Sequence, residues 1–305
     1  MNKIYKGVFP IAPTPFKDDG AIDAESQKRV LDCMIDQGVD GICILANYSE
    51  QFLLSDEERI ELLDLCMDHV ASRVPIIATC SHFSTRIAAT RAKQAAQRGA
   101  AMIMMMPPYH GALLKAGPQG IIEHFTVVAE AAGVPIMVQD APLSGVDLSI
   151  DLLVRMATEM SGVSYFKIET PQTADKLRAL IAAGGDAIAG PFDGEESITL
   201  IADLNAGATG TMPSALLPDL IRPVLTHHAA GDSTAAETQY AKILPLINFE
   251  NRQCGLRACK AVMMEGGVIT TDHVRHPLPP LPTETRTQLL DLARPLDPIA
   301  LRWGR

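Results

Sequence analysis

The sequence has no apolar run long enough to cross a membrane as a helix, and its first residues, Met-Asn-Lys-Ile-Tyr-Lys-Gly, lack the apolar stretch of a signal peptide. Its net charge of -10 at pH 7 argues against nucleic acid or an anionic membrane as a partner. The six cysteines are scattered without a Cys-x-x-Cys pair, so we expect reduced packing residues. These absences favour a cytoplasmic protein that acts on a small molecule.

The sequence also lacks the glycine-rich phosphate-binding patterns Gly-x-Gly-x-x-Gly and Gly-x-x-x-x-Gly-Lys-[Ser/Thr], which argues against a doubly wound nucleotide-binding sheet. Apolar runs instead alternate with amphipathic helical patterns. The expected strands are residues 7–12, 41–45, 75–79, 101–106, 135–139, 165–168, 186–189 and 208–212. The expected helices are residues 23–37, 55–70, 85–98, 119–132, 149–160, 174–183, 196–205 and 216–228.

Eight strand–helix pairs with continuously apolar strands predict the α/β class, as a parallel (β/α)8 TIM barrel over residues 1–229. After residue 230 the strand-like runs stop. Helical patterns at residues 235–247, 254–265 and 284–294 predict a C-terminal all-helical domain over residues 230–305.

Polar residues gather at the carboxyl ends of the expected strands, where such barrels carry their active sites. These residues are Asn47, Tyr48, Ser49, His82, Tyr109, His110, Gln139, Lys167, Glu169 and Asp193. The histidines suit substrate contacts, metal ligands or plain loop positions, and we expect no metal. Asp193 suits either substrate binding or a solvated helix start.

Lys167 is the one lysine among these strand ends. It lies two residues before Glu169, so on a strand both side chains point to the same face. A charged pair on an apolar run requires a polar cavity, and burial there favours the neutral amine, a good nucleophile toward a ketone. The alternative is an edge strand with a solvated Lys–Glu face. The convergence of polar strand ends favours a Schiff-base enzyme.

Several motifs resemble those of the dihydrodipicolinate synthase / N-acetylneuraminate lyase family of class I aldolase-type barrels. They are Thr14-Pro15-Phe16, Glu50 at the end of the second-strand loop, Pro107-Pro108-Tyr109, and Phe166-Lys167-Ile168-Glu169-Thr170. The resemblance implies an imine between Lys167 and a 2-keto acid, with no other cofactor. It also implies that residues 47–49 hold the substrate carboxylate, that Tyr109 belongs to the site, and that the protein is a homotetramer built as a dimer of dimers.

Two departures from the family pattern change the expected reaction. Gln139 replaces the usual strand-five tyrosine, and Glu169 replaces a small residue. Glutamine cannot serve as the base that cleaves a carbon–carbon bond. Glu169 can remove a C3 proton and protonate a departing C4 hydroxyl, with Gln139 orienting it or the hydroxyl.

Within the family, the set Gln139, Lys167 and Glu169 resembles that of the L-2-keto-3-deoxyarabonate dehydratases. This implies a hydro-lyase that forms α-ketoglutaric semialdehyde and water in non-phosphorylated arabinose breakdown. Three alternatives stay open: a 2-keto-3-deoxy acid aldolase, a Δ1-pyrroline-4-hydroxy-2-carboxylate deaminase, and a non-catalytic keto-acid sensor.

Overall fold

The computed structural model describes residues 4–111 and 113–305, so the first three residues of the N-terminal stretch and of the predicted barrel lie outside the described residues. The chain divides into two compact units. Unit 1 comprises Pro75–Met212 with residues 4–6, and unit 2 comprises Gly7–Val74 with Pro213–Arg305. No helix within the described ranges is both long and apolar enough to span a membrane.

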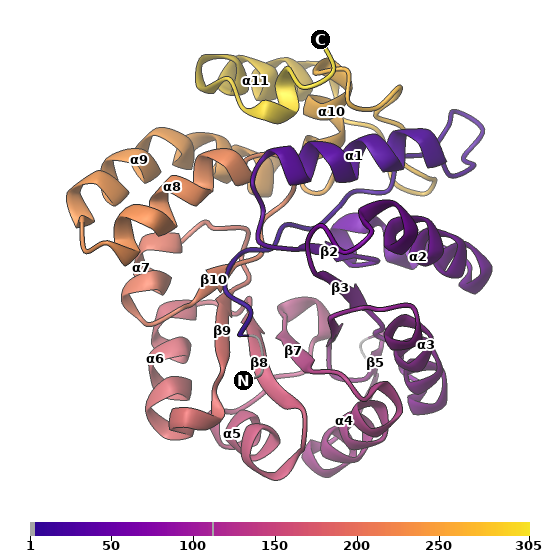
Figure 1. Cartoon of the computed structure of the whole chain (residues 1–305), viewed down its shortest axis with the longest axis vertical. Coiled ribbons are helices and arrows are strands. Elements are labelled where there is room, and N and C mark those ends of the chain that lie inside the picture. The colour runs from indigo at the N-terminus through magenta and orange to yellow at the C-terminus, as the bar shows by residue number, and fades with distance from the viewer. Residues whose placement is uncertain (1–3, 112) are drawn as a thin grey trace. The chain divides into compact units, whose positions relative to one another are not determined.

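Unit 1 contains a parallel sheet whose strands are almost entirely buried. Its order is β10 (Gly210–Thr211), β9 (Gly190–Asp193), β8 (Val163–Ile168), β7 (Ile136–Asp140), β4 (Met102–Met105) and β3 (Ile76–Thr79). Successive parallel strands need helical crossovers. These are α3 (Thr85–Gln97), α4 (Pro118–Ala132), α5 (Ile150–Glu159), α6 (Thr173–Gly184) and α7 (Leu200–Asn205). Helices α3 to α6 lie outside the strands (Figure 1), which explains the continuously apolar strand sequences.

Unit 2 holds the two remaining sheet strands, β1 (Gly7–Val8) and β2 (Ile42–Ile44), and most of the helices. Its helices are α1 (Ala24–Asp36), α2 (Asp56–Val70), α8 (Pro218–Ala229), α9 (Ser233–Phe249), α10 (Arg257–Glu265) and α11 (Thr283–Ala293). A π-helical turn, η5 (Glu250–Cys254), follows α9, and α8 packs beside α9 (Figure 1). A capping box opens α2, because Ser55 and Glu58 each accept a hydrogen bond from the other's backbone N–H.

The predicted seventh strand is wrong in position. Residues 185–187 form a 3-10 turn, η4 (Gly185–Ala187), and strand β9 begins only at Gly190. The strand runs through Pro191, whose carbonyl accepts a hydrogen bond from the Thr209 N–H. Helix α7 also begins later than predicted, because Glu196 and Ser197 have φ of 47° and 68°, which an α-helix does not contain.

A short antiparallel hairpin, β5 (Tyr109–His110) and β6 (Leu114–Lys115), interrupts the fourth strand–helix connection and was not predicted.

All cysteines are free and buried, as expected. Helix α8 ends at Ala229, close to the predicted boundary at residue 230. The compact units do not follow that boundary, and the division into a barrel and a helical domain stays a prediction.

Candidate active site

Lys167, Glu169 and Gln139 converge in unit 1, as the spacing predicted. The register of the sheet sets Lys167 on β8 beside Gln139 on β7, so both side chains share one face. The Lys167 ammonium forms an ion pair with Glu169 Oε1, and Gln139 Nε2 donates a hydrogen bond of 2.8 Å to the same oxygen. The side chains of Lys167 and Glu169 are 2% and 16% exposed. An almost fully buried amine therefore lies against a carboxylate that still reaches solvent.

The backbone at the end of β8 fixes the position of Glu169. Its N–H donates to the Asp140 carbonyl at 2.9 Å, which extends the ladder with β7 beyond Ile168. On the other side, the Gly194 N–H donates to the Ile168 carbonyl at 2.9 Å. The carboxylate thus comes from backbone that is hydrogen-bonded to both neighbouring strands, and it can exchange a proton with a molecule bound at Lys167.

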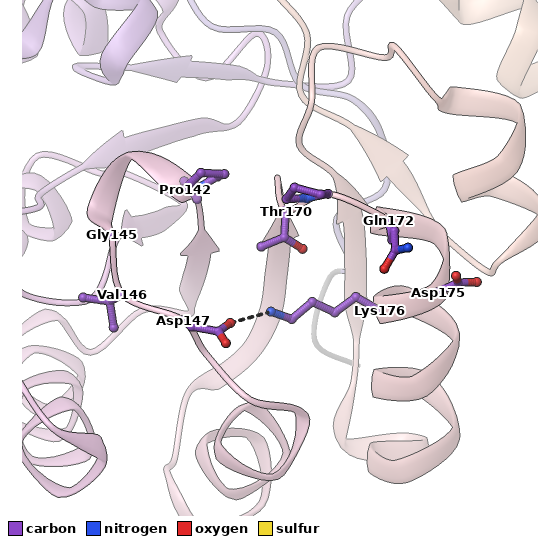
Figure 2. Close-up of a pocket in the computed structure, with 10 residues that line it drawn as sticks. Pro142, Gly145, Val146, Asp147, Thr170, Gln172, Asp175 and Lys176 are labelled. Carbon is purple, nitrogen blue, oxygen red and sulfur yellow. Dashed lines mark ion pairs between the residues drawn. The ribbon is translucent and has the colours of Figure 1, made fainter.

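The opposite face of the same strands carries a different set of groups. Asp140 follows Gln139 and therefore points away from Lys167. Its Oδ2 lies 2.7 Å from Lys176 Nζ, and burial raises the pKa of this carboxyl group despite the lysine. Lys176 also lines a cavity of about 470 Å³ and lies 3.7 Å from Asp147 (Figure 2). This cavity is consequently separate from the Lys167 face.

The strand register turns the Asp193 side chain away from the face that carries Lys167. Asp193 pairs in register with Ile168, one residue after Lys167, so its side chain points to the opposite face. It is 0% exposed and accepts hydrogen bonds from Thr211 Oγ1 at 2.5 Å and the Glu195 N–H at 3.1 Å. Burial raises the pKa of Asp193, and burial together with Asp193 raises the pKa of Asp203 to about 7. The hydrogen bonds of Asp193 are thus internal, and its contact with substrate stays a prediction.

The remaining predicted site residues of unit 1 lie on loops. Tyr109 is half-buried in the β5–β6 hairpin, and burial raises the pKa of its phenol. His110 is exposed, with its ring 6.1 Å from that of Phe83, and His82 Nδ1 accepts a hydrogen bond from the Ser84 N–H. Within residues 4–111 and 113–305, no cluster of three His, Cys, Asp or Glu side chains could hold a metal ion. Substrate contacts by these residues stay predictions.

The loop after β2 lies in unit 2 and forms a 3-10 turn, η1 (Asn47–Ser49). The Ser49 side chain is 1% exposed and differs from our expectation, because its hydroxyl donates to the Ala12 carbonyl at 2.6 Å and accepts from the Ala46 N–H at 3.2 Å. A hydroxyl has one proton, so Ser49 cannot also donate to a substrate carboxylate while this bond is made. Asn47 and Tyr48 are half-buried.

Glu50 ends this loop in a left-handed conformation, with φ of 56°, and its charge is neutralised inside unit 2. It forms an ion pair with Lys260 of α10, and both side chains are 0% exposed. The Lys260 ammonium also lies 4.5 Å from the Phe16 ring centre. Sequence reasoning missed Lys260. A buried glutamate demands a cationic partner, but nothing in the sequence indicates which cation lies beside it.

Comparisons with known proteins agree with this geometry. The sequence model of the Dihydrodipicolinate synthetase family matches residues 4–295. The L-2-keto-3-deoxyarabonate dehydratase of Azospirillum brasilense is 54% identical over 300 residues, which cover 98% of this chain and 97% of that protein. The 4-hydroxy-tetrahydrodipicolinate synthase of Methanothrix thermoacetophila is 26% identical over 95% of this chain and 96% of its own.

Solved structures show the same relationship. YagE, an Escherichia coli K12 prophage protein of the dihydrodipicolinic acid synthase family crystallised with pyruvate, has a TM-score of 0.89 and 25% identity over 97% of this chain and 99% of its own. This likeness confirms the predicted α/β class and parallel (β/α)8 barrel fold. The 54% identity confirms the resemblance to the dehydratases within the family. The chain therefore belongs to the dihydrodipicolinate synthetase family.

Proposed function

We propose that this protein is a Schiff-base hydro-lyase that converts L-2-keto-3-deoxyarabonate to α-ketoglutaric semialdehyde and water. The observation that carries the proposal is the Glu169 carboxylate, which lies between the Lys167 amine and the Gln139 amide. The identity to the Azospirillum dehydratase supports the choice of substrate.

Lys167 begins the proposed reaction. Its amine attacks the C2 ketone and water leaves, which gives an imine. The imine withdraws electrons from C3, and Glu169 removes a C3 proton to form an enamine. The enamine expels the C4 hydroxyl, which takes the proton back from Glu169 and leaves as water. A C5 proton and the C5 hydroxyl proton then move to C3 and C4, so that C5 becomes the aldehyde, and hydrolysis of the imine frees Lys167.

Gln139 favours elimination over cleavage of the C3–C4 bond. Cleavage requires removal of the C4 hydroxyl proton by a base, and an amide has no such capacity. The Gln139 amide donates a hydrogen bond to Glu169 Oε1 and so orients the carboxylate. Glu169 is then the proton-transfer group beside the imine. It removes the C3 proton and protonates the departing C4 hydroxyl.

The other parts of the proposal rest on the family resemblance and on the sequence. The covalent imine serves in place of a cofactor, and the substrate is a small 2-keto acid. The turn Asn47–Ser49 provides a site for the substrate carboxylate through Asn47, Tyr48 and backbone N–H groups, without the Ser49 hydroxyl. We also propose a homotetramer and a cytoplasmic location, the latter because the cysteines are free and buried.

A product assay on a panel of 2-keto-3-deoxy acids tests the proposal. L-2-Keto-3-deoxyarabonate should yield the semialdehyde without pyruvate, and release of pyruvate with glycolaldehyde would identify an aldolase instead. Borohydride with a 2-keto acid should label the protein once, at Lys167. The label should disappear in Lys167→Ala and persist in Lys93→Ala, whose lysine is exposed on α3. A trapped adduct with no product from any acid on the panel would point to a sensor.

A further inference from the structure

Gly194 follows β9 and lies against the two side chains that the proposed reaction uses. A Cβ atom added there would lie 2.6 Å from Glu169 Cγ and 2.7 Å from Lys167 Cγ. It would also lie 2.9 Å from the Ile168 carbonyl oxygen. Real Cβ atoms essentially never show contacts under 3.0 Å, so a side chain at this position must displace its neighbours. The space that holds Lys167 beside Glu169 exists because residue 194 has no side chain.

The backbone of Gly194 cannot easily move away from this contact. Its N–H donates to the Ile168 carbonyl at 2.9 Å. Its neighbour Asp193 accepts hydrogen bonds from Thr211 and from the Glu195 N–H, which fixes the chain on both sides of the glycine. The φ of Gly194 lies outside the left-handed region, so alanine fits the local backbone without strain. The crowding would therefore fall on the side chains of Lys167 and Glu169 and on the Ile168 carbonyl.

Displacement at Cγ changes the position of the reacting groups. The Cγ atoms lie near the root of each side chain, so a shift there carries the ammonium and the carboxylate with it. Misplacement of reacting groups by about 1 Å can cost on the order of 10²-fold in rate. The contact with Glu169 Cγ, at 2.6 Å, is the shortest of the three, so the crowding is partly relieved when residue 169 has no Cγ atom.

We propose that Gly194 is a positioning residue that admits a carboxylate two residues after the imine lysine. This rests on the proposed function, in which Lys167 and Glu169 act on one substrate. An alanine at position 194 is less crowded beside a small residue at position 169 than beside glutamate, because only the contacts with Lys167 Cγ and the Ile168 carbonyl then remain. Positions 169 and 194 are thus coupled, and together they determine whether the site carries an acid–base group for elimination.

The test compares Gly194→Ala, Glu169→Ala and the double variant, with Gly120→Ala as the control. Gly120 lies in α4, where an added Cβ meets only the Ala116 Cβ at 3.5 Å. The measurements are the rate of borohydride trapping with pyruvate, kcat with L-2-keto-3-deoxyarabonate, and the thermal midpoint. Gly194→Ala should lose about 10²-fold in both rates while the control matches wild type. Glu169→Ala should trap pyruvate without turnover.

The double variant separates crowding from other causes. Because the double variant lacks Glu169 Cγ, it should trap pyruvate at least tenfold faster than Gly194→Ala does. This recovers about half of the expected 10²-fold loss on a logarithmic scale. Turnover should stay absent, since the carboxylate is missing. Wild-type trapping and turnover in Gly194→Ala would overturn the inference. So would a double variant that traps no faster than Gly194→Ala, or one that does not fold. If wild type releases pyruvate instead of semialdehyde, the proposed function fails, but the trapping rates still test the coupling.

Discussion

Replacement of Glu169 by glutamine separates proton transfer from imine formation. Both hydrogen bonds to this side chain end on one oxygen, Oε1, where Lys167 and Gln139 donate. The amide oxygen of glutamine can accept the same two bonds, so Glu169→Gln should keep the arrangement and lose only the group that accepts and returns a proton. General acid–base catalysis is worth about 10²–10⁴-fold, or roughly 3–5 kcal/mol in the barrier, and kcat should fall by that factor.

Imine formation should survive this change, because the amine is intact and loss of the neighbouring negative charge favours its neutral, nucleophilic form. The assay measures kcat for semialdehyde release and the rate of borohydride trapping with pyruvate in the same preparations. Glu123→Gln, on the exposed face of α4, is the matched control. Turnover near wild type in Glu169→Gln would show that Glu169 is structural and would refute the proposed proton transfers.

Three further predictions concern the interior of unit 2. Ser49→Ala should lower the free energy of unfolding by about 1–3 kcal/mol in a denaturant titration, since its hydroxyl satisfies two buried backbone groups; a change in KM alone would contradict this. Lys260→Met removes the ion-pair partner of the buried Glu50 carboxylate and should lower the free energy of unfolding by about 3–5 kcal/mol. The double variant with Glu50→Gln should recover most of this loss. An equal loss in the single and the double variant would show that the ion pair is not the cause. Burial raises the pKa of Glu250 to about 7, so the folded state keeps this proton at a higher pH than the unfolded state does, and stability is lost as the pH rises from 4.5 to about 7. Glu250→Gln should therefore leave stability unchanged at pH 4.5 and raise it by up to about 3 kcal/mol at pH 8, measured by thermal unfolding at both pH values.

Local periodicity explains why the centre of the site could be predicted from the sequence. The shared face of Lys167 and Glu169 follows from their spacing of two on a strand, and Gln139 ends another strand in the same parallel sheet. Each of these inferences needs only a correct strand assignment over a few residues. The assignments of β7 and β8 were correct to within a few residues, because each strand contains a short apolar or aromatic run, residues 136–138 in β7 and 165–166 in β8.

The direction of the Asp193 side chain depends on the same alternation along a strand that places Lys167 and Glu169 on one face. We placed the end of the seventh strand at residue 189, which put Asp193 in the following loop with its direction undetermined. The strand in fact runs through Asp193, and alternation along it turns that side chain to the face away from Lys167. A strand misplaced by a few residues therefore leaves the direction of a side chain undetermined or reversed, since side-chain direction has a period of two.

Other contacts were beyond reach for a different reason. Glu50 and Lys260 are separated by 210 residues, and no local pattern in either segment identifies the partner. The role of Gly194 is even more difficult to predict, because a glycine in a polar segment shows only that this position has no side chain. Which side chains occupy the space left by its missing Cβ depends on the register between β8 and β9.

The choice between elimination and carbon–carbon cleavage follows from what surrounds the imine lysine, because the lysine itself serves both reactions. Three neighbouring segments set these surroundings: β7 supplies an amide in place of a base, the residue after β8 supplies the carboxylate, and the residue after β9 leaves room for it. A new acid–base group cannot enter such a close-packed site by one substitution, since the volume it needs must be vacated elsewhere. Glu169 and Gly194 are therefore coupled, and a variant with a small residue at position 169 should tolerate alanine at position 194 better than the wild-type protein does.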